Sequence, residues 1–320
     1  MSLILLAFAG VDSSTAQVAA TYRFDLHLDS ASLFKSKFLH GQYHVPQSFA
    51  FDNQNGCLYV VQVEATDSAG TFDVHSANGD LELTRLSLDG TAILGFMYLR
   101  GFGHGVAIGV EPVAGSTIPY LWTEVDSAPN VNGEGRGTKL GRFRYASGAT
   151  LSTSSSAIQK FSPVLGVQSC TCTVDMRNGY LAMRYQASTN QWRLALYLLS
   201  TIKAGGTVPL CDVAQPVGMG TFQGYASLGS YYYVITGNAY GTDNPVPGNT
   251  ELFCIDWNSG NIVEQRHSNA FGDLIYREPE GISAQWIGND FRLGFGFGSS
   301  VSASDGRRQL SIAYKDTLIP

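Results

Sequence analysis

The chain is poor in charged residues: only 14% of its 320 residues are Asp, Glu, Lys or Arg, and the formal net charge is −6. Helical bundles are rich in Glu, Lys and Ala, so this scarcity argues against them. The negative balance argues against sequence-independent attraction to nucleic acid phosphates. We therefore expect neither a bundle nor a nucleic acid partner.

Cysteine is also scarce, and its spacing excludes two kinds of small domain. The five cysteines are odd in number and contain no CxxC pair, which argues against both a disulfide framework and a zinc site. Cys170 and Cys172 lie two apart in an expected strand, where they share a face without being able to pair. We expect all five to be reduced, and we predict neither a metal nor a cofactor.

Long hydrophobic runs are missing as well. The apolar stretch at residues 3–9 is too short to span a bilayer, and it lacks the preceding basic residue of a secretory signal. A cleaved signal peptide is one interpretation of residues 1–21, and a segment for attachment or oligomerisation is the one we favour. We expect no membrane insertion, and we assign residues 22–320 to one domain.

Glycine and aromatic residues are plentiful, with 36 glycines and 12% aromatics. Together with 44% hydrophobic residues, this composition is typical of many short strands joined by tight turns over a large core. Residues 47–124 show the pattern: apolar runs of strand length are bounded by Asn-Gly and Asp-Gly, a strong hairpin signal. A four-strand module fills residues 47–99, and a second module begins at residue 104.

The module recurs, and fixed-period self-similarity decides fold class. The five copies open at Gln47, His104, Cys170, Gln223 and Glu280. The fifth copy lacks a fourth strand, but residues 31–38 precede the first copy as residues 91–99 precede the second. Closure by this N-terminal strand would remove an open sheet edge. We therefore predict an all-β fold, a five-bladed β-propeller of four-stranded antiparallel blades.

The first strand of each blade lies nearest the axis of a propeller, so the five opening residues should ring the channel mouth on one face. Four of the five are strongly polar. They could face a ligand, or they could bond each other and channel water. The long loops between second and third strands should open on the same face, and loops on a rigid scaffold often carry binding function.

Three stretches near that face combine aromatic rings, Arg or His, and carboxylates, the usual tools for holding a sugar, a polyol or a phosphate. A structural interpretation stands beside each, because Trp122 could pack between blades and Arg136 could pair with Glu134. We predict that ligand-binding residues, none of them catalytic, converge on one concave surface. They are His104, Trp122, Glu124, Arg136, Arg277, Glu278, Glu280, Gln47, Gln223 and Tyr43.

Several motifs together resemble the propeller domain of phage receptor-binding proteins, the family often labelled teichoic acid biosynthesis protein C-like. The resemblance covers roughly residues 22–320, and it implies a propeller head that binds wall teichoic acid glycans on Gram-positive bacteria. It also implies a location in the virion tail, with other tail proteins as partners and a possible homotrimer. The motifs lie at residues 47–52, 83–86, 98–105, 119–124, 136–143 and 277–281.

A glycan-degrading enzyme, either a secreted hydrolase or a lyase, is the alternative function. Glycoside hydrolysis needs a positioned acid and a second carboxylate, and Glu280 is the one carboxylate among the opening residues. A lyase could still use His104 as its base, with Arg277 neutralising a uronate. We favour a non-catalytic phage tail adhesin. Because the chain is acidic, its recognition of an anionic polymer must be local.

Overall fold

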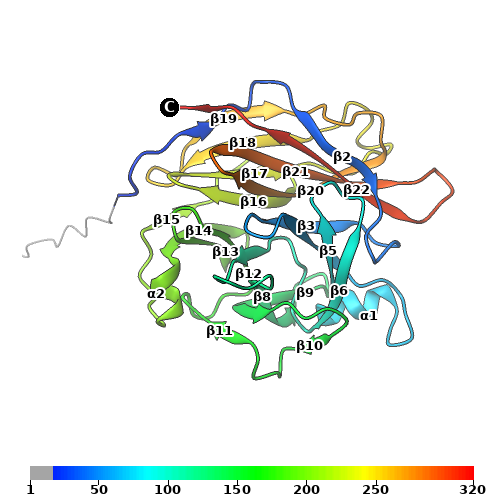
Figure 1. Ribbon diagram of the computed structural model, residues 1–320, viewed down its shortest axis with the longest axis horizontal. Helices are drawn as coiled ribbons and strands as arrows, with labels where there is room; N and C mark the ends of the chain where they lie inside the picture. The colour runs from blue at the N-terminus through cyan, green and yellow to red at the C-terminus, as the bar shows by residue number, and fades with distance from the viewer. Residues whose placement is uncertain (1–16) are drawn as a thin grey trace, which may run out of the picture.

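The computed structural model describes residues 17–320 and shows five blades arranged around one axis (Figure 1). Most of the segment predicted to attach or oligomerise, residues 1–16, lies outside the described residues. The strands of the first two blades, from the axis outward, are β3 (Pro46–Asp52), β4 (Cys57–Val63), β5 (Leu81–Ser87) and β6 (Ile93–Arg100), then β7 (Gly109–Glu111), β8 (Tyr120–Pro129), β9 (Gly135–Arg144) and β11 (Gln159–Phe161).

The remaining three blades have the same antiparallel order, so the predicted five-bladed propeller is confirmed. Their strands are β12 (Cys170–Asp175), β13 (Tyr180–Ser188), β14 (Gln191–Leu198) and β15 (Cys211–Ala214); β16 (Phe222–Leu228), β17 (Tyr231–Thr236), β18 (Glu251–Asp256) and β19 (Ile262–His267); and β20 (Ile275–Ile287), β21 (Asp290–Ser300), β22 (Arg308–Lys315) and β2 (Ala31–Lys37).

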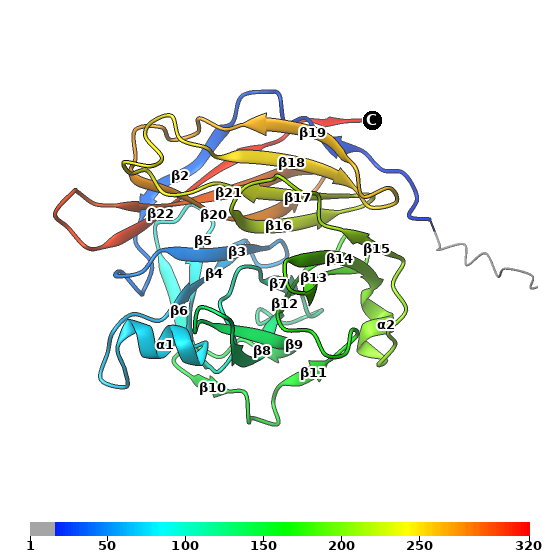
Figure 2. The same ribbon diagram turned by 180° about the vertical axis from the view of Figure 1, so that it is seen from behind.

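The N-terminal strand closes the ring as predicted. Strand β2 pairs antiparallel with β22, placing Phe34 opposite Ile312, and it forms the outer edge of the fifth blade (Figure 2). A second short pair, β1 (Arg23–Phe24) with β23 (Leu318–Ile319), ties the two ends of the described chain together. The fifth blade is thus built from both ends of the domain, which covers the edge of β22.

Three short elements add to the repeat. Strand β10 (Thr150–Ser152) pairs parallel with β6 and widens the first blade. Helix α1 (Phe72–Asn78) lies in the segment between β4 and β5, which the sequence indicated as a polar loop, and α2 (Leu199–Lys203) follows β14. No helix in residues 17–320 is long and apolar enough to cross a membrane.

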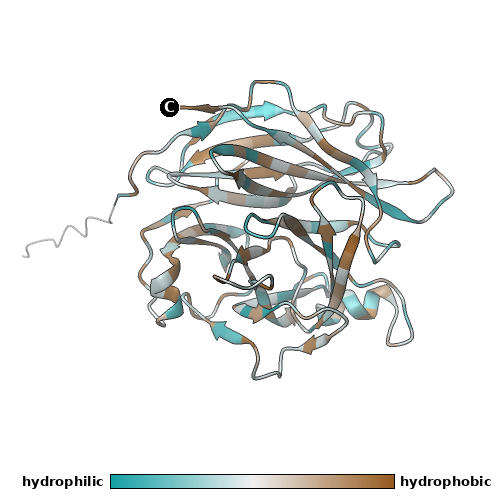
Figure 3. Ribbon diagram, viewed as in Figure 1, coloured by the Kyte–Doolittle hydropathy of each residue, from teal (hydrophilic) through white to brown (hydrophobic). Residues whose placement is uncertain are grey.

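The hydrophobic core lies between the blades. Each of five buried clusters joins two neighbouring blades, as where Tyr59 of β4 and Phe143 of β9 belong to one cluster. Burial on both faces explains why second strands such as β4 and β17 are nearly continuous apolar runs. The outermost strands β11 and β19 are largely hydrophilic by contrast (Figure 3).

Small residues fill the axis, and they sit one position after the predicted opening residues. A Cβ on Gly281 would lie 2.8 Å from the Cα of Ser48, and one on Gly224 would lie 2.9 Å from the Cα of Gly281. Ser48 Oγ donates to the carbonyl of Gly105 at 2.6 Å. Successive strand side chains point to opposite faces, so the opening residues point away from this contact. The contacts nearest the axis are thus made by the residues that follow Gln47, His104, Gln223 and Glu280, and a ring of opening residues around the channel mouth stays a prediction.

Candidate functional site

The upper face, defined here as the face that carries the loops between second and third strands, holds a pocket of about 200 Å³. Blades 2, 3 and 4 all contribute to its walls, and Thr171 of the innermost strand β12 is among the lining residues. The side chains that give it chemistry are Glu124, Arg136, Arg184, Gln186, Trp192 and Phe222.

Arg184 is the most tightly placed of these side chains. Its guanidinium carbon lies 3.6 Å from the centre of the Trp192 ring and 3.8 Å from that of Phe222, so the charge is held between two aromatic faces. Nε donates to Gln215 Oε1 at 2.7 Å, while the two terminal nitrogens have no hydrogen-bond partner within residues 17–320. Burial lowers the pKa of Arg184 to about 9, which leaves the group charged at neutral pH. A planar cation with unused donors therefore faces the pocket.

Arg136 and Glu124 bring opposite charges to the same pocket. Arg136, on β9, pairs with Glu134 at 2.7 Å and stays partly exposed. Glu124, on β8, is buried, and its two oxygens accept backbone N–H bonds from Gly105 at 2.7 Å and Gly137 at 2.6 Å. Burial raises the pKa of Glu124, although these bonds and Arg136 oppose the rise. Glu124 thus fixes the loop between β6 and β7 against β9, and Arg136 remains available to a ligand.

Among the other predicted residues, His104 lies beside the pocket, close enough for the charges of Arg136 and Glu134 to act on it. Burial lowers the pKa of His104 to about 3, with a smaller contribution from the charge of Arg136, so the imidazole of His104 is neutral. Gln223 donates to the carbonyl of Gly237 at 3.0 Å, while Tyr43 is 65% exposed. Gln47 is partly exposed at the start of β3. Ligand contact by these four residues stays a prediction.

Two residues predicted to contact a ligand, Trp122 and Arg277, are fully buried, so these two predictions are wrong. Trp122 has no exposed surface; its ring stacks on Phe161, and its Nε1 donates to Glu111 at 2.8 Å. Arg277 is also wholly buried, and it donates to the carbonyls of Ala270 and Ser268 and to the hydroxyl of Thr250. Both side chains have structural roles, so neither offers a surface to a ligand.

Glu278 and Glu280 lie on β20 of the fifth blade and do not line the pocket. Burial raises the pKa of both carboxyls, and the charge of Glu278 adds to the effect on Glu280. Tyr276, two residues before Glu278, has a left-handed backbone with φ of 71°, and the β20–β21 register shifts twice nearby. A role for this acidic pair in ligand binding remains a prediction separate from the pocket.

The sequence prediction missed Arg184, Trp192 and Phe222. Arg184 is a lone cation inside the otherwise uncharged strand β13, where an Arg needs partners to be buried. This lone charge in a strand was the one feature of the sequence that could have identified Arg184. Trp192 lies on another strand of the same blade, and Phe222 lies on another blade. Sequence spacing therefore could not predict that the two rings enclose the guanidinium group of Arg184.

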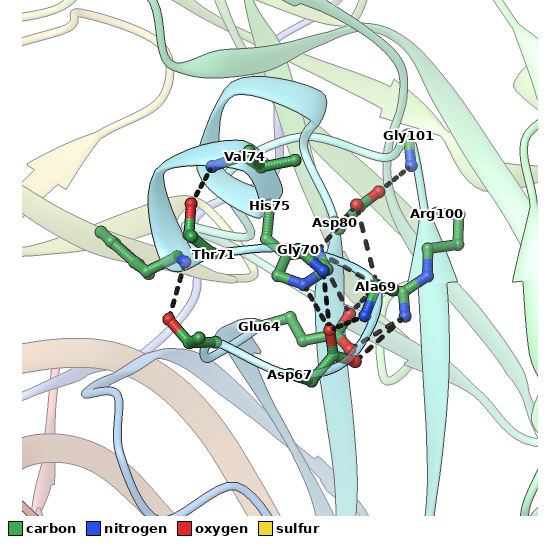
Figure 4. Close-up of polar contacts among 12 residues, drawn as sticks. Glu64, Asp67, Ala69, Gly70, Thr71, Val74, His75, Asp80, Arg100 and Gly101 are labelled. Carbon is green, nitrogen blue, oxygen red and sulfur yellow. Dashed lines mark hydrogen bonds and ion pairs between the residues drawn. The ribbon is translucent and has the colours of Figure 1, made fainter.

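A second polar cluster anchors α1 to the first blade (Figure 4). His75 is buried in α1, with Nδ1 3.0 Å from Asp80 Oδ2 and Nε2 3.0 Å from Asp67 Oδ1. An imidazolium satisfies both bonds, because an ionised carboxylate can only accept. Arg100 pairs with Glu64 beside them. Glu64, Asp67 and His75 place potential ligand atoms within 4.8 Å of one another, but Arg100 already pairs with Glu64, and His75 already bonds to Asp67 and Asp80.

This cluster predicts a pH dependence of stability. Burial lowers the pKa of His75, but the bonds to Asp80 and Asp67 raise it overall above its ordinary 6.5. The stabilisation is therefore complete below pH 6.5 and lost as the pH rises through the higher folded value. We expect the free energy of unfolding of wild type, relative to His75→Gln, to decline across that range. Denaturant titrations at closely spaced pH values test this, and a pH-independent difference between the two proteins would contradict it.

A substitution at Trp122 tests whether this side chain has a structural role. Glu111 accepts hydrogen bonds from Trp122, from Arg142 at 2.6 Å and from Lys203 at 2.6 Å, so it clamps the second blade to α2. Trp122→Phe removes one donor and should lower the free energy of unfolding by about 1–2 kcal/mol. Ligand binding should not change. A loss of binding with unchanged stability would restore Trp122 to the site.

Five blades closed around a packed axis, with a charged and aromatic pocket on one face, define a five-bladed β-propeller. The chain belongs to the family of phage 5-bladed β-propeller receptor binding platform domains, whose sequence profile matches residues 45–286. This family assignment confirms the resemblance seen in the sequence motifs.

Two known proteins are similar to this chain, one in sequence and one in fold. The chain is 32% identical over 248 residues to the "Putative major teichoic acid biosynthesis protein C" of Bacillus subtilis, covering 74% of this chain and 52% of that protein. Its structure is similar to the tail fiber of Staphylococcus aureus phage P68, with a TM-score of 0.70 and 16% identity over 92% of this chain and 54% of that one. The similarity to the tail fiber is a similarity of fold. The chain spans about half the length of each relative.

Proposed function

We propose that this protein is a receptor-binding head of a phage tail that recognises a phosphate-bearing glycopolymer of a Gram-positive cell wall, such as wall teichoic acid. The observation that carries the proposal is the pairing of Arg136 and Arg184 in one pocket with the aromatic rings of Trp192 and Phe222. Guanidinium groups recognise phosphate through paired hydrogen bonds, and aromatic faces pack against sugars and polyols. The family and the names of the two similar proteins are consistent with this role.

Local charge explains how an acidic chain can hold an acidic polymer. The net charge of −6 offers no long-range attraction. Within the pocket, however, the one carboxylate, Glu124, is engaged by two backbone N–H groups, whereas both guanidinium groups line the cavity and the terminal nitrogens of Arg184 have no hydrogen-bond partner within residues 17–320. The balance of free donors in the pocket therefore favours an anion.

Binding is better supported than catalysis by the state of the candidate acids and bases. Hydrolysis of a glycosidic bond needs two carboxyl groups about the scissile bond, and Glu124 is the one carboxyl lining the pocket. A lyase would need a base, but the lowered pKa of His104 makes that imidazole a poor one at neutral pH. The pocket is equipped to hold a polymer and lacks a suitable pair of groups to cut it.

Attachment to the tail would use the face opposite the pocket. The described chain enters along that lower face, where Val18 bonds to Asn258 in the turn after β18 and Thr21 bonds to Ser230 in the turn after β16. A connection through residues 1–21, to other tail proteins or to two further copies of the chain, would then direct the pocket toward the cell.

Retention on purified cell walls tests the proposed function. We expect the protein to sediment with intact walls, to stay in solution after the teichoic acid has been extracted, and to release neither reducing nor unsaturated ends. Release of such ends would support the enzyme instead. Equal retention on extracted walls would contradict recognition of the phosphate-bearing polymer.

A further inference from the structure

A groove of about 380 Å³ lies on the rim between the fourth and fifth blades, away from the upper pocket. One wall is the end of β19 and the segment after it, and the other is the segment leading into β2 together with the end of β22. The chemistry-bearing side chains along it are Arg266, His267, Asn269, Lys315, Asp29 and Ser30.

Two cations of this groove form no ion pair within residues 17–320, although the charges of Asp29, Asp25 and Glu264 act on Lys315 from farther away. Lys315 is only 6% exposed, and its ammonium donates to the carbonyl of Leu28 but has no carboxylate within 4.0 Å in the described chain. Arg266 is exposed and has neither an ion pair nor a side-chain hydrogen bond within residues 17–320. Burying an ammonium group without a paired anion is costly, so the arrangement favours an anionic occupant. Asp29 is the one carboxylate in the lining.

The wall that carries Arg266 is rigidly organised. Buried Arg277 donates to the carbonyls of Ser268 and Ala270, both of which belong to the groove wall. His267 contacts Glu251 through Nδ1 and Asn269 through Nε2, at 3.1 and 3.0 Å. These bonds hold the backbone and the neighbouring polar groups in place, which lowers the cost of ordering them on binding. Arg277, predicted to contact a ligand, instead shapes this wall.

We propose that the rim groove is a second oxyanion site, in which Arg266 and Lys315 hold a phosphate group while Ser30 and Asn269 contact its polyol or sugar substituent. The groove would take another phosphate of the same polymer. The identity of that natural ligand rests on the proposed function, whereas the affinity for a phosphate ester does not. Two separated phosphate sites on one head would strengthen adhesion to a repeating polymer.

Titration of the full chain with glycerol 3-phosphate tests the inference, followed by NMR signals of groove and pocket residues. We expect both sets to shift in wild type. In Arg184→Met, only the groove set should respond. In Arg266→Gln, the groove affinity should fall about tenfold while the pocket set responds normally. Glycerol at the same concentration should shift neither set.

The outcomes separate this inference from the proposed function. Absent groove shifts in wild type, or unchanged groove affinity in Arg266→Gln, would overturn the second site. Arg266 is exposed, so Arg266→Gln should fold normally and a change in groove affinity reports on binding. A protein that binds glycerol 3-phosphate in the groove but is not retained on cell walls would refute the proposed function and leave the groove assignment standing.

Discussion

Deletion of residues 1–38 should yield a protein that aggregates and shows no cooperative unfolding. The deletion removes β2 and uncovers the edge of β22. It also removes Phe24, Leu26 and Phe34, which are 0%, 0% and 5% exposed. Each such side chain contributes about 1.5–3 kcal/mol, so the loss of about 5–9 kcal/mol matches the whole stability of many domains.

The matched control is a deletion of residues 1–16. Val18 is buried and bonds to Asn258, so the control stops before it. We expect this shorter deletion to stay in solution and to keep the melting temperature of the full chain, even if its elution volume changes with the oligomeric state. Size-exclusion chromatography and calorimetry compare the two proteins. Equal solubility and equal melting temperatures would contradict the closing role of β2.

Arg184→Met should weaken binding to the cell-wall polymer by about 30- to 100-fold, or about 2–3 kcal/mol. Methionine can fill the space between Trp192 and Phe222, but it donates no hydrogen bond to a phosphate. Arg184→Lys should restore little of the affinity, because an ammonium group lacks the planar, bidentate guanidinium geometry. Surface plasmon resonance with immobilised polymer measures both variants.

Arg177→Ala is the control for the Arg184 variants. Arg177 is also an arginine over an aromatic ring, 4.7 Å from the centre of Phe291, but it lies in the turn after β12 on the lower face. Its removal should leave polymer affinity unchanged. Melting temperatures of all three variants must stay near wild type for the comparison to report on binding. Equal losses in Arg177→Ala and Arg184→Met would mean that the upper pocket has no special role.

The architecture could be predicted because its signals are local and repeated. Turn sequences such as Asn-Gly mark hairpins, five copies fix the number of blades, and the strand missing from the last copy indicates closure by residues 31–38. Helix α1 was not predicted, because it is short and depends on a cluster in which His75 meets carboxylates from both sides. Such a cluster forms only after β4, β5 and β6 come together.

The site was only partly predictable because it depends on the direction of each side chain. Glu124 and Arg136 were found by residue type and do line the pocket. Trp122 and Arg277 were chosen for the same reason, yet they point into the protein, since a shift of one residue in a strand exchanges its faces. Arg184 looked like part of an apolar strand. Its partners, Trp192 and Phe222, reach it from another strand and another blade.

The most direct test of the proposed recognition is a crystal structure of the protein bound to a short phosphodiester-linked polyol oligomer. The proposed function predicts a phosphate about 3 Å from the terminal nitrogens of Arg184, with Arg136 on its other side and the polyol against Trp192. An oligomer bound on the lower face, or a pocket left without a phosphate at concentrations that saturate binding in solution, would contradict it.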